Sequence, residues 1–329
     1  MRQPKQPPGK SSIPDVDTPA TELRLAAPGR VENGGPPGGR YKPGVASNPE
    51  PALRVPSTKG VTVAVHDLGG DGPPLLVAHA NGFCGGAYGP LARELAGHRQ
   101  VWALDFRGQG QSTPPEDLDF DWAGLADDVL AVVDALGGGP LDVLGHSMGG
   151  AGLLRAEVQR PGTIRRAYLY EPIVLPAGLG ELTTGGNVMA DGARRRRETF
   201  PSRAHAAWSY ARRPPLGFLR ADALAAYVEF GFEELEDGTA RLRCRGEHEA
   251  RMFEASGTIT TDDAADVALP VTVALGDLEE GWGGPARFAP AIAEALPNGR
   301  LSEHPLLGHF GPLENPPVIA ADVLASLDG

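Results

Sequence analysis

The chain has 329 residues, of which 41% are hydrophobic and 22% are charged, a length that allows one large domain or two ordinary ones. Lysine and arginine number 30 against 42 aspartates and glutamates, which gives a formal charge of −12. This acidic balance argues against nucleic acid as a partner, because phosphates attract a basic surface, and against electrostatic docking to a membrane of anionic lipid.

The first 58 residues differ in composition from the rest of the chain. They contain the stretches PKQPPGK, NGGPPGGRYKPG and NPEPALRVP, which are rich in Pro and Gly and poor in aromatic and β-branched residues. Such sequence buries too little apolar surface to offset the entropy that is lost on ordering. We therefore predict that residues 1–58 form a disordered or loosely ordered tail.

The cysteines and the apolar runs bear on the cellular compartment. Cys84 and Cys244 are too few for a disulfide framework, which is typical of a reducing environment. The basic start is not followed by the apolar stretch of a signal peptide, and no run approaches the roughly 18 apolar residues of a membrane-spanning helix. We expect a cytoplasmic protein.

From residue 59 onwards, short apolar runs alternate with amphipathic ones. This pattern predicts strands at 61–66, 74–79, 101–105, 141–144 and 166–170, and helices at 122–136 and 150–159. The alternation lapses over 175–268, a stretch too long for a simple connection, where helices are expected at 204–211, 221–230 and 247–255. It resumes with strands at 271–275 and 300–304 and helices at 286–296 and 318–327. We predict a mostly parallel α/β core (59–174 and 269–329) with an inserted helical cap (175–268).

The segment Gly145-His-Ser147-Met-Gly149 directly follows one of these strands and opens a helix. This is the strand–turn–helix setting of a G-x-S-x-G elbow. The glycines are needed because strand and helix approach so closely that a Cβ atom would clash. The elbow holds its serine exposed near a helix N-terminus, and we predict that Ser147 is a nucleophile.

A serine hydroxyl is a weak nucleophile and needs an adjacent base. His309 lies downstream of Ser147, after the last predicted strand and before the last predicted helix. This position matches the chain order nucleophile, acid, histidine of elbow enzymes. His146 is expected to point away from the nucleophile, and the other histidines are interpreted as surface or structural residues. We predict that His309 is the base.

Three carboxylates are candidates for orienting the imidazole. Glu279 and Asp277 follow the predicted strand 271–275, where an acid is expected. Glu171 ends the strand 166–170 at the carboxyl edge of the sheet, where an unpaired carboxylate would be costly. We take Glu279 as the first candidate, with Glu171 and then Asp277 as alternatives.

Acyl transfer also needs donors for the developing oxyanion. One is expected to be the backbone N–H of Met148, the residue after the nucleophile. The other is expected in the loop His79-Ala-Asn81-Gly-Phe83, which follows an earlier strand, and we favour the N–H of Phe83. Asn81 could add a side-chain donor, although Asn-Gly is also a common turn sequence.

Together these residues resemble the α/β-hydrolase superfamily over about residues 60–329. The motifs that carry the resemblance are HANGF, DFRGQGQS, GHSMGG and GHFGPLENP, in that order. The resemblance implies the α/β-hydrolase fold, with a central sheet flanked by helices and a cap over the nucleophile. Two features depart from the family pattern: Ala-Asn stands where many members have His-Gly directly, and Glu279 occupies the place of an Asp. The second departure favours Glu171, because a strand-end acid serves in some dehalogenase relatives.

We expect a serine hydrolase that cleaves a carboxylic ester, thioester or lactone of a small molecule through an acyl-enzyme. The same constellation also fits an acyltransferase, a C–C bond hydrolase or a cofactor-free perhydrolase, and a retained scaffold could serve as a non-catalytic ligand-binding protein. No metal-ligand spacing and no nucleotide-binding loop are present, so no cofactor is implied. The cluster Arg194–Arg197 could hold a substrate anion, although a solvated helix face has the same pattern. Oligomeric state is not indicated.

Overall fold

The computed structural model describes residues 49–178, 187–256, 259–277 and 284–329. The chain divides into two units, Met1–Ala46 and Ser47–Gly329, and the described residues lie in the second. Among these described residues, no helix is long and apolar enough to span a bilayer.

Eight strands form one sheet in the order β1-β2-β4-β3-β5-β6-β10-β11. Their bounds are β1 Leu53–Pro56, β2 Thr62–Gly69, β3 Pro74–Ala78, β4 Gln100–Leu104, β5 Leu141–His146, β6 Ile164–Tyr170, β10 Val271–Leu275 and β11 Gly299–Glu303. The pairs from β4 to β11 are parallel, whereas β1 and β2 are antiparallel to each other and β2 is antiparallel to β4. The predicted mostly parallel sheet is therefore confirmed, with an antiparallel addition at one edge.

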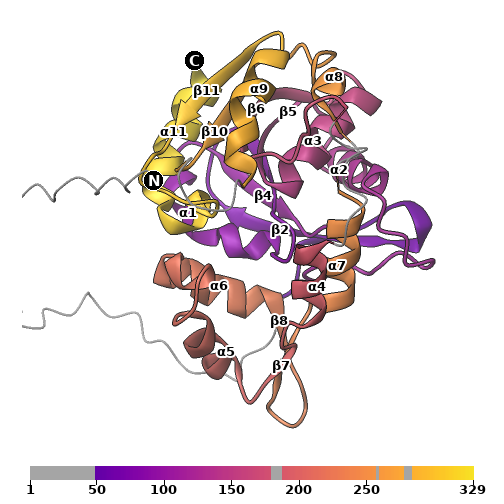
Figure 1. The fold of residues 1–329 in the computed structure, drawn as a ribbon, viewed down its shortest axis with the longest axis vertical. Helices are drawn as coiled ribbons and strands as arrows, with labels where there is room; N and C mark the ends of the chain where they lie inside the picture. The colour runs from indigo at the N-terminus through magenta and orange to yellow at the C-terminus, as the bar shows by residue number, and fades with distance from the viewer. Residues whose placement is uncertain (1–48, 179–186, 257–258, 278–283) are drawn as a thin grey trace, which may run out of the picture. The chain divides into compact units, whose positions relative to one another are not determined.

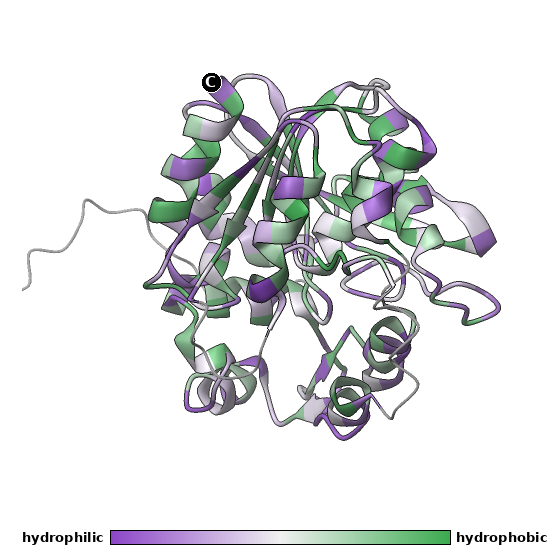
Figure 2. Ribbon diagram, turned by 45° about the horizontal axis from the view of Figure 1, so that its top comes forward, coloured by the Kyte–Doolittle hydropathy of each residue, from purple (hydrophilic) through white to green (hydrophobic). Residues whose placement is uncertain are grey.

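Helices cover both faces of this sheet (Figure 1). One face carries α1 (Gly89–Leu95), α10 (Gly311–Glu314) and α11 (Pro316–Asp328), and the other carries α2 (Ala123–Ala135), α3 (Met148–Gln159), α8 (Thr261–Ala264) and α9 (Ala289–Ala295). Each face has its own apolar core, because the central strands are buried on both sides. Figure 2 shows the hydrophobic strands enclosed between helices with mixed polar surfaces.

Strand β1 was not predicted, because its residues fall inside the proline-rich segment assigned to the tail. Leu53 pairs with Val65 and Pro56 with Thr62 of β2, and Val55 is buried. Proline is tolerated here because β1 lies at the edge of the sheet, where its missing N–H faces no neighbouring strand. The ordered core thus begins earlier than the predicted boundary at 58, and residues 1–48 lie outside the described part of the chain.

The cap segment, residues 187–256, contains helices and a small sheet. The helices are α4 (Val188–Arg194), α5 (Arg203–Tyr210), α6 (Ala221–Gly231) and α7 (Gly246–Glu254). Strands β7 (Thr199–Phe200), β9 (Ala240–Leu242) and β8 (Phe232–Glu234) pair in that order, antiparallel. The three predicted helices match α5, α6 and α7, whereas α4 and the small sheet were missed because these elements are only two to seven residues long. Figure 1 shows the cap segment at the lower edge of the core.

The chain leaves the core and returns to it at one point. Leu175 forms a parallel bridge with Thr260, in which the Leu175 N–H donates to Ile259 O (3.1 Å) and the Thr261 N–H donates to Leu175 O (2.9 Å). The next helix, α8, contacts α3 and α9 of the core. The two ends of the insertion are therefore fastened side by side.

Candidate active site

The functional candidates gather at the carboxyl edge of the parallel strands. His79 follows β3, Ser147 follows β5, Glu171 follows β6 and Gly276 follows β10. Strands β3, β5, β6 and β10 are consecutive neighbours in the sheet, so these residues share one edge. In open α/β sheets, this edge is where ligands bind.

Ser147 lies in a strained turn between β5 and α3. Its backbone has φ 55° and ψ −118°, a conformation that L-residues rarely adopt. A Cβ on Gly149 would lie 2.1 Å from Ala78 O, and one on Gly145 would lie 2.6 Å from the Cα of Gly150, so both positions require glycine. The Ser147 N–H donates to Tyr170 O (2.9 Å), which joins the turn to the end of β6.

His309 and Glu171 form a hydrogen-bonded pair beside this turn. The His309 Nδ1 lies 2.6 Å from Glu171 Oε2. Because an ionised carboxylate only accepts, Nδ1 carries the proton and Nε2 remains as the acceptor. The other oxygen, Oε1, accepts from the Gly276 N–H (2.9 Å). The glutamate side chain is 2% exposed and the histidine side chain 29%, so the carboxylate is enclosed while the imidazole keeps an open side.

The other two predicted acids lie elsewhere. Glu279 falls in 278–283, outside the described residues. Asp277 donates its backbone N–H to Leu307 O (2.7 Å) and lines a hollow of about 500 Å³ together with Leu306 and Glu314. In the structure, the carboxylate that is hydrogen-bonded to His309 is Glu171.

The loop after β3 arranges its amides differently from the sequence-based expectation. The Phe83 N–H donates to Ala80 O (3.1 Å), and the Gly82 N–H donates to the side chain of Gln109 (2.7 Å). The Asn81 N–H has no acceptor among the described residues. Met148 is the first residue of α3, so its amide has no partner within the helix. The side chain of Phe83 packs beside Phe310, with the centroids of the two rings 5.2 Å apart.

His146, which was expected to point away from the nucleophile, lies among groups from two other parts of the chain. It is fully buried, its Nδ1 lies 2.7 Å from the Tyr88 hydroxyl, and its Nε2 lies 2.8 Å from the carbonyl oxygen of His309. Only its position next to Ser147 could have drawn attention to it in the sequence, because both partners come from distant parts of the chain.

A second histidine–carboxylate pair lies at the same edge, two strands away from β5. His66 Nε2 lies 2.9 Å from Asp105 Oδ2, and both side chains are buried. Asp105 also accepts from the backbone N–H groups of Gly85 (2.7 Å) and Gln111 (2.8 Å). Burial raises the pKa of the Asp105 carboxyl, but His66, together with His79 and the Gln111 N–H, outweighs burial and holds the pKa below its usual value.

The cap segment contacts the loop after β3 through a partly buried ion pair. Arg196 donates to Glu249 Oε2 (2.7 Å) and to the Tyr227 hydroxyl, which itself donates to Gly82 O (3.2 Å). The Asn81 side chain donates to the backbone carbonyl of Glu249 (3.1 Å). The cap is thus fastened to the turn that carries the candidate oxyanion donors.

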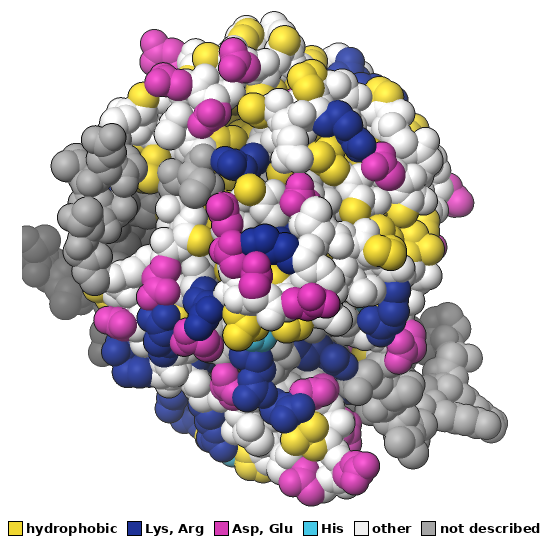
Figure 3. All heavy atoms as spheres, turned by 90° about the vertical axis from the view of Figure 1, so that its right-hand side faces the viewer, with side chains coloured by type: hydrophobic (Ala, Val, Ile, Leu, Met, Phe, Trp, Pro, Cys, Tyr) yellow, Lys and Arg dark blue, Asp and Glu magenta, His cyan; other side chains and the backbone are white. Residues whose placement is uncertain are grey.

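The arginines of the predicted cluster 194–197 do not act as one basic patch. Arg194 pairs with Glu247 and Glu254, Arg196 pairs with Glu249, and Arg197 lies over the ring of Phe200. Figure 3 shows basic side chains gathered at the lower part of one face, with acidic ones among them.

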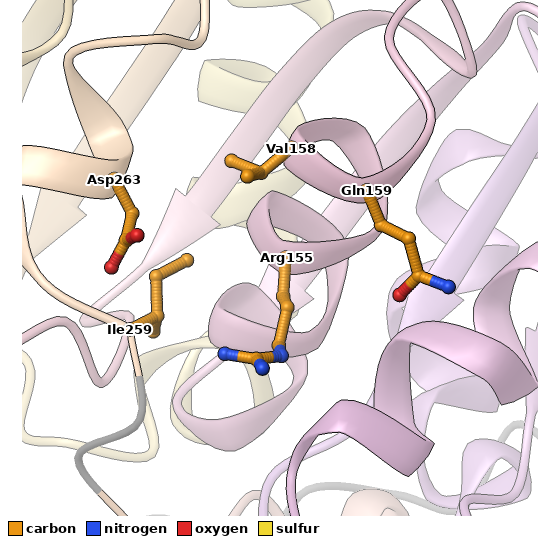
Figure 4. A pocket seen from close by; sticks show the side chains of 5 residues that line it. All are labelled: Arg155, Val158, Gln159, Ile259 and Asp263. Atoms are coloured by element: carbon orange, nitrogen blue, oxygen red, sulfur yellow. The ribbon is translucent and has the colours of Figure 1, made fainter.

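A separate hollow of about 250 Å³ lies on the surface of the core (Figure 4). Arg155, Val158 and Gln159 of α3 line one side, and Ile259 and Asp263 line the other. These α3 residues lie two to three turns from Ser147, so this hollow is distinct from the candidate site.

Comparison with known proteins places these features in a family. Residues 75–322 match a family model described as "Alpha/beta hydrolase family". The chain is 31% identical over 122 residues to the N-formylmaleamate deformylase of Pseudomonas putida (37% of this chain, 46% of that protein) and 38% identical over 106 residues to human monoglyceride lipase (31% and 35%). These alignments therefore span less than half of either relative. The crystal structure of an E-2-(acetamidomethylene)succinate hydrolase superposes with a TM-score of 0.69 at 21% identity, covering 84% of this chain and 98% of that one.

Proposed function

The chain belongs to the alpha/beta hydrolase family, and from this premise we propose that it is a serine hydrolase acting on a small molecule. Its substrate is a carboxylic ester, thioester or lactone, which is cleaved through an acyl-enzyme on Ser147. The observation that carries this proposal is the 2.6 Å hydrogen bond between His309 and the enclosed Glu171, on a loop that adjoins the strained serine turn.

In the first half-reaction, His309 Nε2 takes the hydroxyl proton as Ser147 Oγ attacks the substrate carbonyl. The tetrahedral intermediate collapses, and the leaving oxygen or sulfur takes the proton back from the imidazolium. In the second half-reaction, His309 activates a water that attacks the acyl-enzyme, and Ser147 leaves with the proton. Glu171 holds the imidazole in the required tautomer and stabilises the imidazolium.

Two backbone amides are proposed to stabilise the oxyanion. Met148 supplies the first, at the N-terminus of α3, where the helix dipole also favours negative charge. For the second we propose Asn81, because the Phe83 amide, which we favoured from the sequence, would have to leave its 3.1 Å hydrogen bond to Ala80 O.

Amide-type substrates are the second candidate. Relatives of the chain include a deformylase and a hydrolase of an acetamidomethylene-succinate, whose names point to acyl groups on nitrogen. The same serine, histidine and glutamate would serve, with the imidazolium protonating a nitrogen leaving group instead of oxygen or sulfur.

The proposal is tested by the intact mass of the protein after reaction with a fluorophosphonate, together with turnover of short and medium nitrophenyl esters and anilides. We expect stoichiometric labelling, and a fall in turnover of about 10⁴–10⁶-fold in Ser147→Ala. Ser202→Ala, at the N-cap of α5, is the control and should label like the wild type. A folded wild-type protein that is not labelled would overturn the proposal and favour a ligand-binding role.

A further inference from the structure

His146 makes two buried hydrogen bonds that the proposed reaction does not use. It is the last residue of β5, immediately before Ser147, and its side chain is inaccessible to solvent. Rings surround it, at centroid distances of 6.1 Å for Tyr88, 5.8 Å for Tyr170, 5.1 Å for His309 and 5.9 Å for Phe310. An apolar side chain could fill such a place, so the buried imidazole calls for a physical reason.

The partners of His146 fix the direction of both hydrogen bonds. The carbonyl oxygen of His309 can only accept, so His146 Nε2 carries the proton (2.8 Å). Nδ1 is then an acceptor, and the Tyr88 hydroxyl must donate to it (2.7 Å). The oxygen of that hydroxyl in turn accepts from the Ala80 N–H (3.2 Å). One continuous chain therefore runs from Ala80 through Tyr88 and His146 to His309, with each group used in a single direction.

Two further observations agree with a fixed, neutral imidazole. Burial, with the nearby His309 as a second cause, holds the pKa of His146 well below its usual value. The loop of the proposed base is also held from a second side, because the Tyr170 hydroxyl donates to Gly308 O (2.8 Å). The backbone at 308–309 is thus fastened to strands β5 and β6 independently of the hydrogen bond between His309 and Glu171.

We propose that His146 is a positioning residue, which sets the distance between the loop that carries the base and the loop that carries the second oxyanion donor. This inference rests on the proposed function. Ala80 lies one residue before Asn81, and the Tyr88 hydroxyl and the His146 ring together link that loop to the His309 peptide. The separation between the base and the donor loop then depends on this buried chain of hydrogen bonds, and an error of about 1 Å in such a separation can cost a hundredfold in rate.

The test compares His146→Phe, which removes both hydrogen bonds, with His146→Gln, whose amide can donate to His309 O and accept from Tyr88. We expect His146→Phe to lower kcat about 10–100-fold on a nitrophenyl ester with KM changed less than threefold, and His146→Gln to recover most of this loss. Tyr88→Phe, which removes a single hydroxyl, should lower kcat about 3–10-fold. His98→Gln is the matched control, since His98 is exposed and precedes β4 at the opposite, amino edge of the parallel strands, and it should retain the wild-type kcat.

A double-mutant cycle separates positioning from general stability. If His146 acts through the base, adding His146→Phe to His309→Ala should cause no further loss of rate. Additive losses, or a wild-type kcat in a folded His146→Phe or Tyr88→Phe protein, would overturn the inference, and Tyr88→Phe decides the question if His146→Phe does not fold. Fluorophosphonate labelling of the wild type distinguishes this failure from failure of the proposed function, because labelling would persist in the first case and be absent in the second.

Discussion

Two histidine–carboxylate pairs lie at the same edge of the sheet and differ in what surrounds them. His66 and Asp105 are 2.9 Å apart, and His309 and Glu171 are 2.6 Å apart. Both carboxylates are almost completely buried. The His66 side chain, however, is 3% exposed and is covered by the ring of Phe230 at 5.3 Å, whereas the His309 side chain is 29% exposed.

The difference indicates that access, and not the hydrogen bond itself, distinguishes the proposed base from a structural support. Asp105 divides its acceptor capacity among His66, Gly85 and Gln111, so it ties together three segments of backbone. Glu171 uses one oxygen on Gly276 and the other on the imidazole of His309, whose side chain stays partly exposed. We therefore expect removal of the first pair to weaken the fold and removal of the second to weaken the chemistry.

Among changes to the two pairs, the largest effect is expected from Glu171→Gln. The amide can still accept from the Gly276 N–H but cannot hold the imidazole in the required tautomer, so kcat/KM should fall about 10³–10⁴-fold. Steady-state hydrolysis of a nitrophenyl ester measures this, and thermal unfolding should remain close to that of the wild type. Glu279→Gln and Asp277→Asn are the matched controls. A large loss in Glu279→Gln instead would return the acid to the loop after β10.

Asp105→Asn should show the opposite behaviour. Losing the charge leaves buried donors poorly satisfied, and we expect the free energy of unfolding to fall by about 2–4 kcal/mol. The folded fraction should keep kcat within about tenfold of the wild-type value. Urea unfolding and kinetics on the same samples check both parts, and a stable but inactive variant would contradict the structural role.

The same residue predicts a pH dependence of stability. The folded-state pKa of Asp105 lies below its usual value of 3.8, so its contribution is fully present above about pH 4 and is lost as the pH falls through the lower folded-state pKa. Wild-type stability should therefore decrease with acidification below about pH 4, and the slope should be shallower in Asp105→Asn. If stability depends on pH equally steeply in the two proteins, the titration of Asp105 does not contribute to the acid sensitivity of the fold.

The smallest expected effect concerns the strained backbone of Ser147. Glycine adopts φ 55°, ψ −118° without steric cost, so Ser147→Gly should be more stable than Ser147→Ala by about 1–2 kcal/mol. Both variants lack the serine hydroxyl, so the difference between their free energies of unfolding reports the backbone strain. Equal unfolding midpoints would mean that the turn stores little strain.

The sequence predicted what short motifs encode. Ser147 follows from glycines that must lie within one tight turn, and the strands follow from apolar runs that the parallel sheet buries on both faces. The acid could not be chosen in this way. Glu171 and the loop after β10 lie at adjacent strand ends because Tyr170 pairs with Ala274, and this register depends on packing across the whole sheet. The proline after Glu171, which ends β6 at the carboxylate, was the available signal.

Features that depend on backbone geometry were also missed. The Phe83 N–H is engaged because the turn that begins at Ala80 closes tightly enough for a hydrogen bond to Ala80 O, and no residue pattern predicts that closure. Strand β1 has only four residues in a proline-rich context, where composition outweighs alternation. Strand β1 can be recognised only from its pairing with β2, which the sequence does not show.

The bridge between Leu175 and Thr260 has a consequence for how such a protein can diversify. Because the two ends of the insertion lie about one strand spacing apart, roughly 4.8 Å, the excursion between them can lengthen, shorten or be replaced without displacing the strand ends. Ser147, Glu171 and His309 all lie outside this excursion. The sheet edge that carries these three residues can therefore stay unchanged while the length and sequence of the inserted segment vary.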